Sequence, residues 1–159
     1  MPEEQPQQGL PAEERALAAA LFNETWGLLD KADRTDEETD RMVHLAHASR
    51  LHWDNIGTDE NRAGGEWQCS RVYAVLGRAE PALHHALRSV AYADREGVAT
   101  WMRASAQEAL ARAHLVAGDV AAAEEARVRA WALLDAEHDQ EDREIVAADL
   151  QSLVFPPLG

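Results

Sequence analysis

Apolar side chains recur every three or four residues through most of the chain, the spacing that puts them on one face of an α-helix. Between residues 13 and 30 the positions with this spacing are Leu17, Leu21, Phe22, Thr25, Trp26, Leu28 and Leu29. The same pattern predicts further helices over 36–55, 58–76, 80–96, 100–117, 119–136 and 139–153. Because only short polar segments separate these stretches, neighbouring helices are expected to run antiparallel.

Several predicted helices begin at residues whose side chains can accept a hydrogen bond from an unpaired backbone amide. Thr35 and Glu38 have the spacing of a capping box, in which side chain and backbone satisfy each other reciprocally. Thr58, Asp119 and Asp139 are the caps expected for three later helices. Residues 1–11 are rich in Pro, Glu and Gln, and we expect them to be a disordered tail.

Two stretches of the chain share a pattern that ends one helix at a glycine and begins the next with small residues. The first is Trp67, Ser70, Tyr73, Leu76, Gly77, Ala82, Leu83 and Ala86. The second is Glu108, Ala111, His114, Ala117, Gly118, Ala123, Glu124 and Arg127. The two glycines are 41 positions apart (118 minus 77). Glycine adopts the left-handed conformation at little steric cost, so each is expected to close its helix.

These residue types resemble the tetratricopeptide family, with Tyr73, Gly77 and Ala82 as the better copy and Gly118 and Ala123 as the weaker one. The resemblance covers roughly residues 58–136, and its period exceeds the usual ~34 residues of that family. It implies an all-α protein, a tetratricopeptide-like antiparallel array of about seven helices. We expect residues 12–155 to form one such domain.

Composition narrows the classes of partner. The net charge of −14 argues against a nucleic-acid binder and against anionic membrane surfaces, and it favours basic or neutral protein partners. No apolar run approaches the ~20 residues that a membrane span needs, and no leader pattern opens the chain, so a cytoplasmic protein is expected. The single cysteine, Cys69, is expected to be a small buried apolar residue.

The second predicted helix is rich in histidine. With 100° per residue, His44, His47 and His52 share an arc about 140° wide with the apolar residues Ala48 and Leu51. The prediction is that this arc faces protein, with Trp53 close by.

The third predicted helix carries two further polar rows. Glu66, Ser70 and Tyr73 form one stripe, and Trp67 and Arg71 form the next. In tetratricopeptide arrays the first helix of each pair lines the inner groove, so the resemblance implies that Trp67 and Arg71 face a ligand. The Gly64–Gly65 pair before them is expected to allow close approach of another backbone or a ligand.

We therefore predict one enclosed site where the second and third helices meet. Its candidate acid–base residues are His47, His52 and Glu66, and Arg71 would hold an anionic group. The candidate ligand-binding residues are Arg71, Trp67, Trp53, His44, Ser70 and Tyr73, with Asn23 and Trp26 from the first helix. The alternative is structural: histidines that are hydrogen-bonded within the core, Glu66 and Arg71 that form structural ion pairs with neighbouring residues, and tryptophans that only pack.

Metal binding is weakly supported, because His44 and His47 are three residues apart while helical zinc motifs use pairs four apart. Neither a metal nor a cofactor is expected. The segments 44–53 and 66–82 also resemble a group of small bacterial helical proteins, of which a few are associated with secondary metabolism.

Two classes of function follow. The first is a binding module whose groove takes a small anionic molecule or a partner protein or peptide segment. The second is a small acid–base enzyme that performs an elimination or cyclisation in the same pocket. The uncovered ends of such an array allow a homodimer, and the alternative is that the last predicted helix, with Ile145, Val146, Leu150 and Leu153, caps the array.

Overall fold

The computed structural model describes residues 9–158, of which most are helical. The seven helices of this part of the chain are α1 (Gly9–Leu29), α2 (Asp36–Ile56), α3 (Asp59–Val75), α4 (Ala79–Ala93), α5 (Thr100–Ala117), α6 (Val120–Asp135) and α7 (Gln140–Gln151). The residues described contain no β-strand, and the all-α prediction is confirmed. None of these helices is long and apolar enough to cross a membrane.

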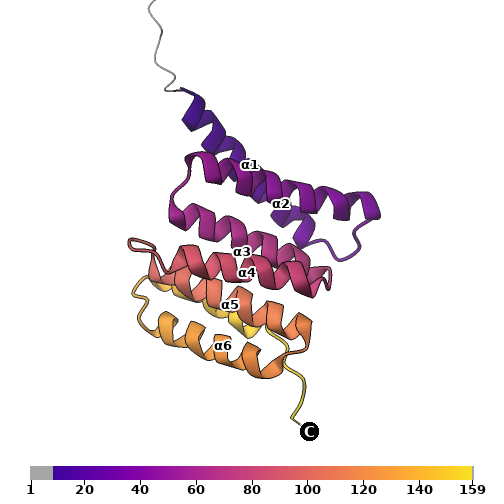
Figure 1. Ribbon diagram of the computed structural model, residues 1–159, viewed down its shortest axis with the longest axis vertical. Helices are drawn as coiled ribbons and strands as arrows, with labels where there is room; N and C mark the ends of the chain where they lie inside the picture. The colour runs from indigo at the N-terminus through magenta and orange to yellow at the C-terminus, as the bar shows by residue number, and fades with distance from the viewer. Residues whose placement is uncertain (1–8, 159) are drawn as a thin grey trace, which may run out of the picture.

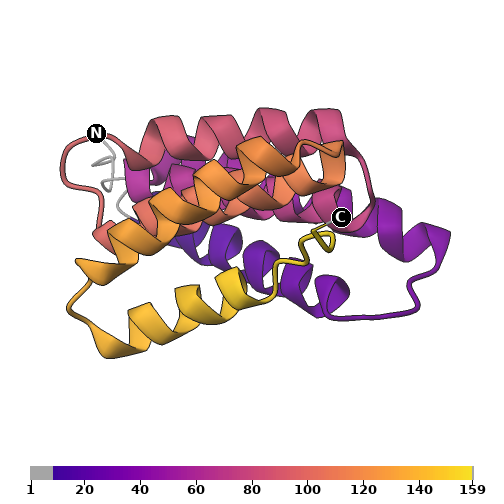
Figure 2. The same cartoon turned by 90° about the horizontal axis from the view of Figure 1, so that it is seen from below.

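The helices form three successive antiparallel pairs, α1 with α2, α3 with α4, and α5 with α6 (Figure 1). Within the stack α3 also contacts α5, and α7 packs against α5 and α6. In Figure 2, α1 and α7 lie on the side of the molecule opposite α4. The first helices of the three pairs, α1, α3 and α5, therefore lie together with α7 along one side of the array.

Helix starts follow the predicted caps. The Thr35 hydroxyl accepts from the Glu38 amide while the Glu38 carboxylate accepts from the Thr35 amide, which completes the capping box. Thr58, Asp119 and Asp139 cap α3, α6 and α7 in the same positions that the sequence indicates. The helix α1, by contrast, begins at Gly9, four residues before the predicted start. Most of the predicted tail, residues 1–8, lies outside the described residues.

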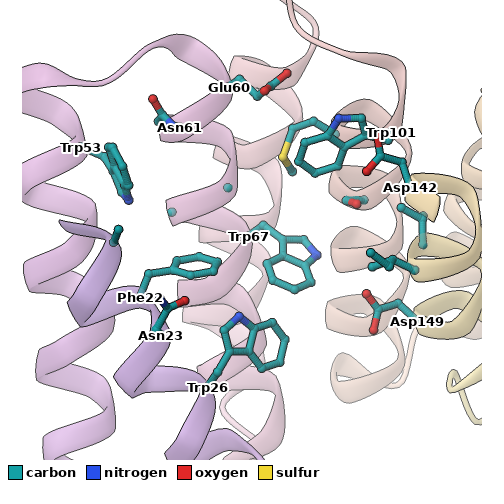
Figure 3. Close-up of a pocket in the computed structure, with 17 residues that line it drawn as sticks. Phe22, Asn23, Trp26, Trp53, Glu60, Asn61, Trp67, Trp101, Asp142 and Asp149 are labelled. Carbon is teal, nitrogen blue, oxygen red and sulfur yellow. The ribbon is translucent and has the colours of Figure 1, made fainter. Parts of the chain in front are cut away.

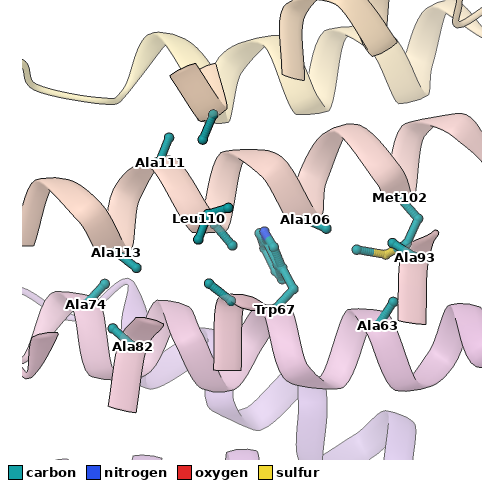
Figure 4. Close-up of a cluster of buried hydrophobic side chains, with 13 residues drawn as sticks. Ala63, Trp67, Ala74, Ala82, Ala93, Met102, Ala106, Leu110, Ala111 and Ala113 are labelled. Atoms are coloured by element: carbon teal, nitrogen blue, oxygen red, sulfur yellow. The ribbon is translucent and has the colours of Figure 1, made fainter. Parts of the chain in front are cut away.

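Alanine dominates the contacts between helix pairs. The largest cluster of buried apolar residues joins α3, α4 and α5, and Ala63, Ala74, Ala82, Ala93, Ala106, Ala111 and Ala113 belong to it (Figure 4). Small side chains let the helix axes approach closely, since interaxial distance depends on the residues at the contact. Cys69 is fully buried in a separate cluster between α2 and α3 with Met42, Ala46 and Val72, as expected for a small apolar residue.

Both repeat glycines adopt the predicted conformation, with φ of 70° at Gly77 and 81° at Gly118. Replacing Gly118 with alanine is expected to destabilise the protein by about 1 kcal/mol, because an L-residue is strained in the left-handed region. Replacing Gly27, inside α1, with alanine should instead stabilise it by about 0.5–1 kcal/mol. A Cβ at either position meets no atom within 4 Å, so the two changes differ in backbone conformation alone. Urea unfolding of both variants measures the effect, and shifts of equal sign would contradict this explanation.

Candidate functional site

A groove with a volume of about 500 Å³, partly open to solvent, lies between α1, α3, α5 and α7. Its aromatic lining consists of Phe22, Trp26, Trp53, Trp67 and Trp101, which include four of the five tryptophans of the chain (Figure 3). Aliphatic side chains of α5 and α7 complete the apolar surface, and the polar residues that line it are Asn23, Glu60, Asn61, Ser105, Asp142 and Asp149. Hereafter this hollow is called the groove.

The aromatic rings hold one another in place. The ring centroids of Trp26 and Trp67 are 5.4 Å apart, and Phe22 meets Trp26 edge-on at 6.4 Å. Trp67 is further fixed by a 3.1 Å hydrogen bond from its Nε1 to Oε2 of Glu108 on α5. The wall of the groove on α3 is therefore rigid, which lowers the entropy cost of binding.

Gly64 and Gly65 both line the groove, and Gly65 also lies against Arg50 of α2. A Cβ at Gly65 would lie 2.8 Å from Cδ and 3.5 Å from Cα of Arg50. The predicted close approach of another backbone is confirmed at this position. The helix α3 continues through both glycines without a break.

One buried carboxylate, Glu108, joins α3 to α5 behind the wall of the groove. Besides Trp67, it accepts hydrogen bonds from Arg71 at 3.3 Å and Arg112 at 2.7 Å. Arg71 reaches on to Asp149 of α7, at 3.5 Å. Burial, together with the charge of Glu108, raises the pKa of the Asp149 carboxyl. The guanidinium of Arg71 is thus already paired with two carboxylates and is not among the residues that line the groove.

A second polar cluster lies on the other side of α3, between α2, α3 and α4. The Glu66 carboxylate accepts from Arg50 Nε at 2.9 Å and from His85 Nδ1 at 2.6 Å. The ring of Tyr73 stacks on that of His85, and its hydroxyl is 2.8 Å from Nε2 of His47. We call Arg50, Glu66, His47, Tyr73 and His85 the imidazole cluster.

Burial and neighbouring charges together set the pKa values in the imidazole cluster. Burial would raise the pKa of Glu66, but hydrogen bonds and charges of His85 and Arg50 hold it below the ordinary value. Burial and the neighbouring His85 lower the pKa of His47. Burial also raises the pKa of the nearby Cys69 thiol, which disfavours its thiolate form.

The structure divides the predicted site between these two places. Asn23, Trp26, Trp53 and Trp67 line the groove. His47, Glu66 and Tyr73 belong to the imidazole cluster, and Arg71 is held by Glu108 and Asp149. The prediction that all of them converge on one enclosed spot is wrong, because Glu66 and Trp67 are adjacent in sequence and project from different sides of α3.

The remaining predicted residues lie elsewhere. Nδ1 of His52 is hydrogen-bonded to the Glu14 carboxylate of α1 at 2.9 Å. The Ser70 hydroxyl donates to the carbonyl oxygen of Ala82 at 2.9 Å. His44 is exposed. These three residues neither line the groove nor form hydrogen bonds with the imidazole cluster.

The predicted orientation of α2 needs correction as well. Its buried residues are Met42, Leu45, Ala46, Ser49 and Trp53. On a helical wheel with His44 at zero they span about 100–200°, nearly opposite the histidine arc. Leu51, within that arc, is 60% exposed. His47 and His52 lie at the two flanks of the buried face and are half-buried for that reason.

Several residues at these two places were not predicted as site residues. They include Phe22, Glu60, Trp101, Met102, Asp142 and Asp149 at the groove and Arg50 and His85 in the imidazole cluster, and Glu108 behind the groove was not predicted either. For Glu108 a signal existed: the repeat alignment pairs it with Trp67, and the two are hydrogen-bonded. No comparable pattern in the sequence indicates that α7 lies beside the groove.

Within residues 9–158, no three His, Cys, Asp or Glu side chains are grouped so that they could hold a metal ion. Comparison of the chain with protein-family models, with curated proteins and with solved structures gave no match.

Proposed function

We propose that the protein is a binding module of tetratricopeptide-like construction whose groove receives a segment of a partner protein. The observation that carries this proposal is the groove itself, about 500 Å³ in volume, with four of the five tryptophans on its wall. Aromatic side chains concentrated in one concave, mostly apolar surface are typical of binding sites. The first helices of the three pairs line it, as the resemblance to the tetratricopeptide family implies.

A partner segment is favoured over an anionic small molecule by the charge of the lining. Among the described residues that line the groove, none is Lys, Arg or His, whereas Glu60, Asp142 and Asp149 are acidic. Arg71, the predicted anion anchor, is neutralised by carboxylates. An anion in this groove would meet repulsion without a compensating donor of positive charge. The partial opening to solvent also suits a chain that must enter and leave the groove.

Acid–base catalysis is the second candidate, and one observation favours it: the 2.6 Å contact of His85 with Glu66, beside His47 and Tyr73. A carboxylate that orients an imidazole is a common catalytic arrangement. This pair lies across α3 from the groove, so the two candidates are separable by mutation. Turnover that survives a blocked groove but is lost in His85→Gln would favour the enzyme.

Blocking the groove tests the binding proposal. Asn23 is exposed and lines the groove, so Asn23→Tyr is expected to fill part of it without disturbing the core. Ala20→Tyr adds the same side chain to an exposed position of α1 that does not line the groove. We expect Asn23→Tyr to weaken retention of a pooled random heptapeptide library on the immobilised protein at least tenfold, about 1.4 kcal/mol. Ala20→Tyr should leave retention unchanged.

The outcome that would contradict the proposal is equal retention by the parent protein and Asn23→Tyr, or no retention by either. Circular dichroism of both variants controls for folding. Titration calorimetry with the best-retained peptides then gives the dissociation constants for the three proteins.

A further inference from the structure

One end of the groove differs from the rest in its electrostatics. Glu60, in the first turn of α3, and Asp142, in the first turn of α7, both line this end, and Trp101 lies between them in Figure 3. The other residues that line the groove are apolar or uncharged, except Asp149, which is paired with Arg71. We call Glu60, Trp101 and Asp142 the acidic end.

The carboxylates of the acidic end lack the cationic partners that their neighbours have. Asp59, next to Glu60, is paired with Arg62 at 3.1 Å and Arg95 at 3.0 Å. The Glu60 carboxylate accepts one hydrogen bond, from the Ala99 amide at 2.9 Å. Within the part of the chain that the structure describes, neither Glu60 nor Asp142 forms an ion pair, and the Asp142 side chain has no hydrogen-bond partner.

The electrostatic field at this end is negative for a second reason. Desolvation raises the pKa of Asp142, and so do the charges of four more carboxylates, on Asp139, Glu137, Glu141 and Glu60. Carboxylates in the first turn of a helix ordinarily gain from the positive end of the helix dipole. The surrounding carboxylates oppose that gain, so a positive charge placed here would relieve repulsion between like charges.

We infer that the groove takes a partner segment that carries one Arg or Lys, whose cationic group sits at the acidic end between Glu60 and Asp142 over the ring of Trp101. A cation is attracted both by the carboxylates and by the face of an indole ring. The apolar side chains flanking that basic residue would cover Trp26 and Trp67 in the rest of the groove. The net charge of −14 steers such a partner toward the protein before contact. This inference rests on the proposed function, because it names the chemistry of the segment that the groove receives.

The test uses four synthetic heptapeptide libraries that differ only in the central residue, which is Arg, citrulline, norleucine or Glu. Citrulline keeps the size and hydrogen-bonding shape of arginine without its charge. We expect the Arg library to be retained about tenfold more than the citrulline library on the full-length protein, and the Glu library least. Added salt should weaken retention of the Arg library alone.

Protein variants locate the charge effect. Asp142→Asn and Glu60→Gln are each expected to reduce the preference for Arg over citrulline about threefold to tenfold, while retention of the norleucine library stays unchanged. Gln at position 60 keeps an oxygen that can accept from the Ala99 amide, so the local structure is preserved. Glu125→Gln, at an exposed position of α6, makes the same change in net charge away from the groove and should leave the preference intact.

The possible results are distinguishable. Equal retention of the four libraries, abolished in each case by Asn23→Tyr, would overturn the cation inference and leave the proposed function standing. No retention of any library would overturn both. A preference for Arg that Glu125→Gln reduces as much as Asp142→Asn would assign the effect to net charge and overturn the site at the acidic end.

Discussion

Glu108→Gln is expected to lower the free energy of unfolding by about 3 kcal/mol, the largest effect of any single polar substitution considered for this chain. The Glu108 side chain is buried, and it accepts from Arg71, Arg112 and Trp67. A neutral amide leaves two guanidinium groups with less compensating charge in a poorly hydrated place. Because the Arg71 and Arg112 side chains are each 19% exposed and Arg71 keeps Asp149 as a partner, the cost should fall at the lower end of the range for a broken buried pair.

Urea unfolding at pH 7 measures this cost, and Glu124→Gln provides the matched control. Glu124 forms an ion pair of the same kind with Arg127, but on the surface of α6, where such pairs contribute no more than about 0.5–1 kcal/mol. Equal destabilisation by the two substitutions would contradict the role assigned to burial. The same comparison bears on the groove, because Glu108 holds the indole of Trp67 on its wall.

Glu66→Gln is expected to destabilise the protein by about 2 kcal/mol at neutral pH, with a dependence on pH that identifies the cause. The carboxylate of Glu66 is buried against Arg50 and His85, and these partners hold its pKa below the unfolded value of 4.5. A group with a lowered pKa stabilises the fold fully above its unfolded pKa and loses that contribution as the pH falls through the folded value. The difference between the parent protein and Glu66→Gln should therefore be constant above about pH 5.5 and shrink below pH 4.5.

Chemical denaturation at a series of pH values between 3 and 8 measures that difference directly. Glu125→Gln, which removes an exposed carboxylate from α6, is the control and should show little difference at any pH. A destabilisation by Glu66→Gln that does not change between pH 7 and pH 3 would mean that packing, and not the charge of Glu66, is responsible.

Local features of the fold were predictable because each depends on a few neighbouring residues. The hydrogen bonds of the capping box, between Thr35 and Glu38, lie within one helical turn. The left-handed conformations of Gly77 and Gly118 are likewise local features of the backbone. The boundaries of α5 follow from the sequence for the same reason. The start of α1 was predicted too late, because the sequence just before Gly9 contains no Ser, Thr, Asp or Asn that would indicate a cap.

The candidate site was predictable only in part. Four predicted residues, Asn23, Trp26, Trp53 and Trp67, do line the groove, since helical spacing and residue type suffice to mark an aromatic face. The histidine arc of α2 misled because Ala48 and Leu51 made it look apolar, whereas α1 and α3 cover the opposite face, on which Met42 and Ser49 lie.

The sequence by itself determined the helices, their caps, their closing glycines and the small residues that let them pack, because these depend on interactions within a turn or two of the chain. Tertiary structure alone decided from which side of α3 each polar residue projects. It decided that Glu66 is hydrogen-bonded to His85 and that Glu108 is hydrogen-bonded to Trp67 and Arg71. It also decided that α7 brings Asp142 to the groove beside Trp101. Those contacts depend on the rotation of each helix about its axis and on how helices distant in sequence cross. Hydrophobic periodicity determines neither, because a helical wheel gives the angles between residues of one helix and not the direction in which that helix faces its neighbours.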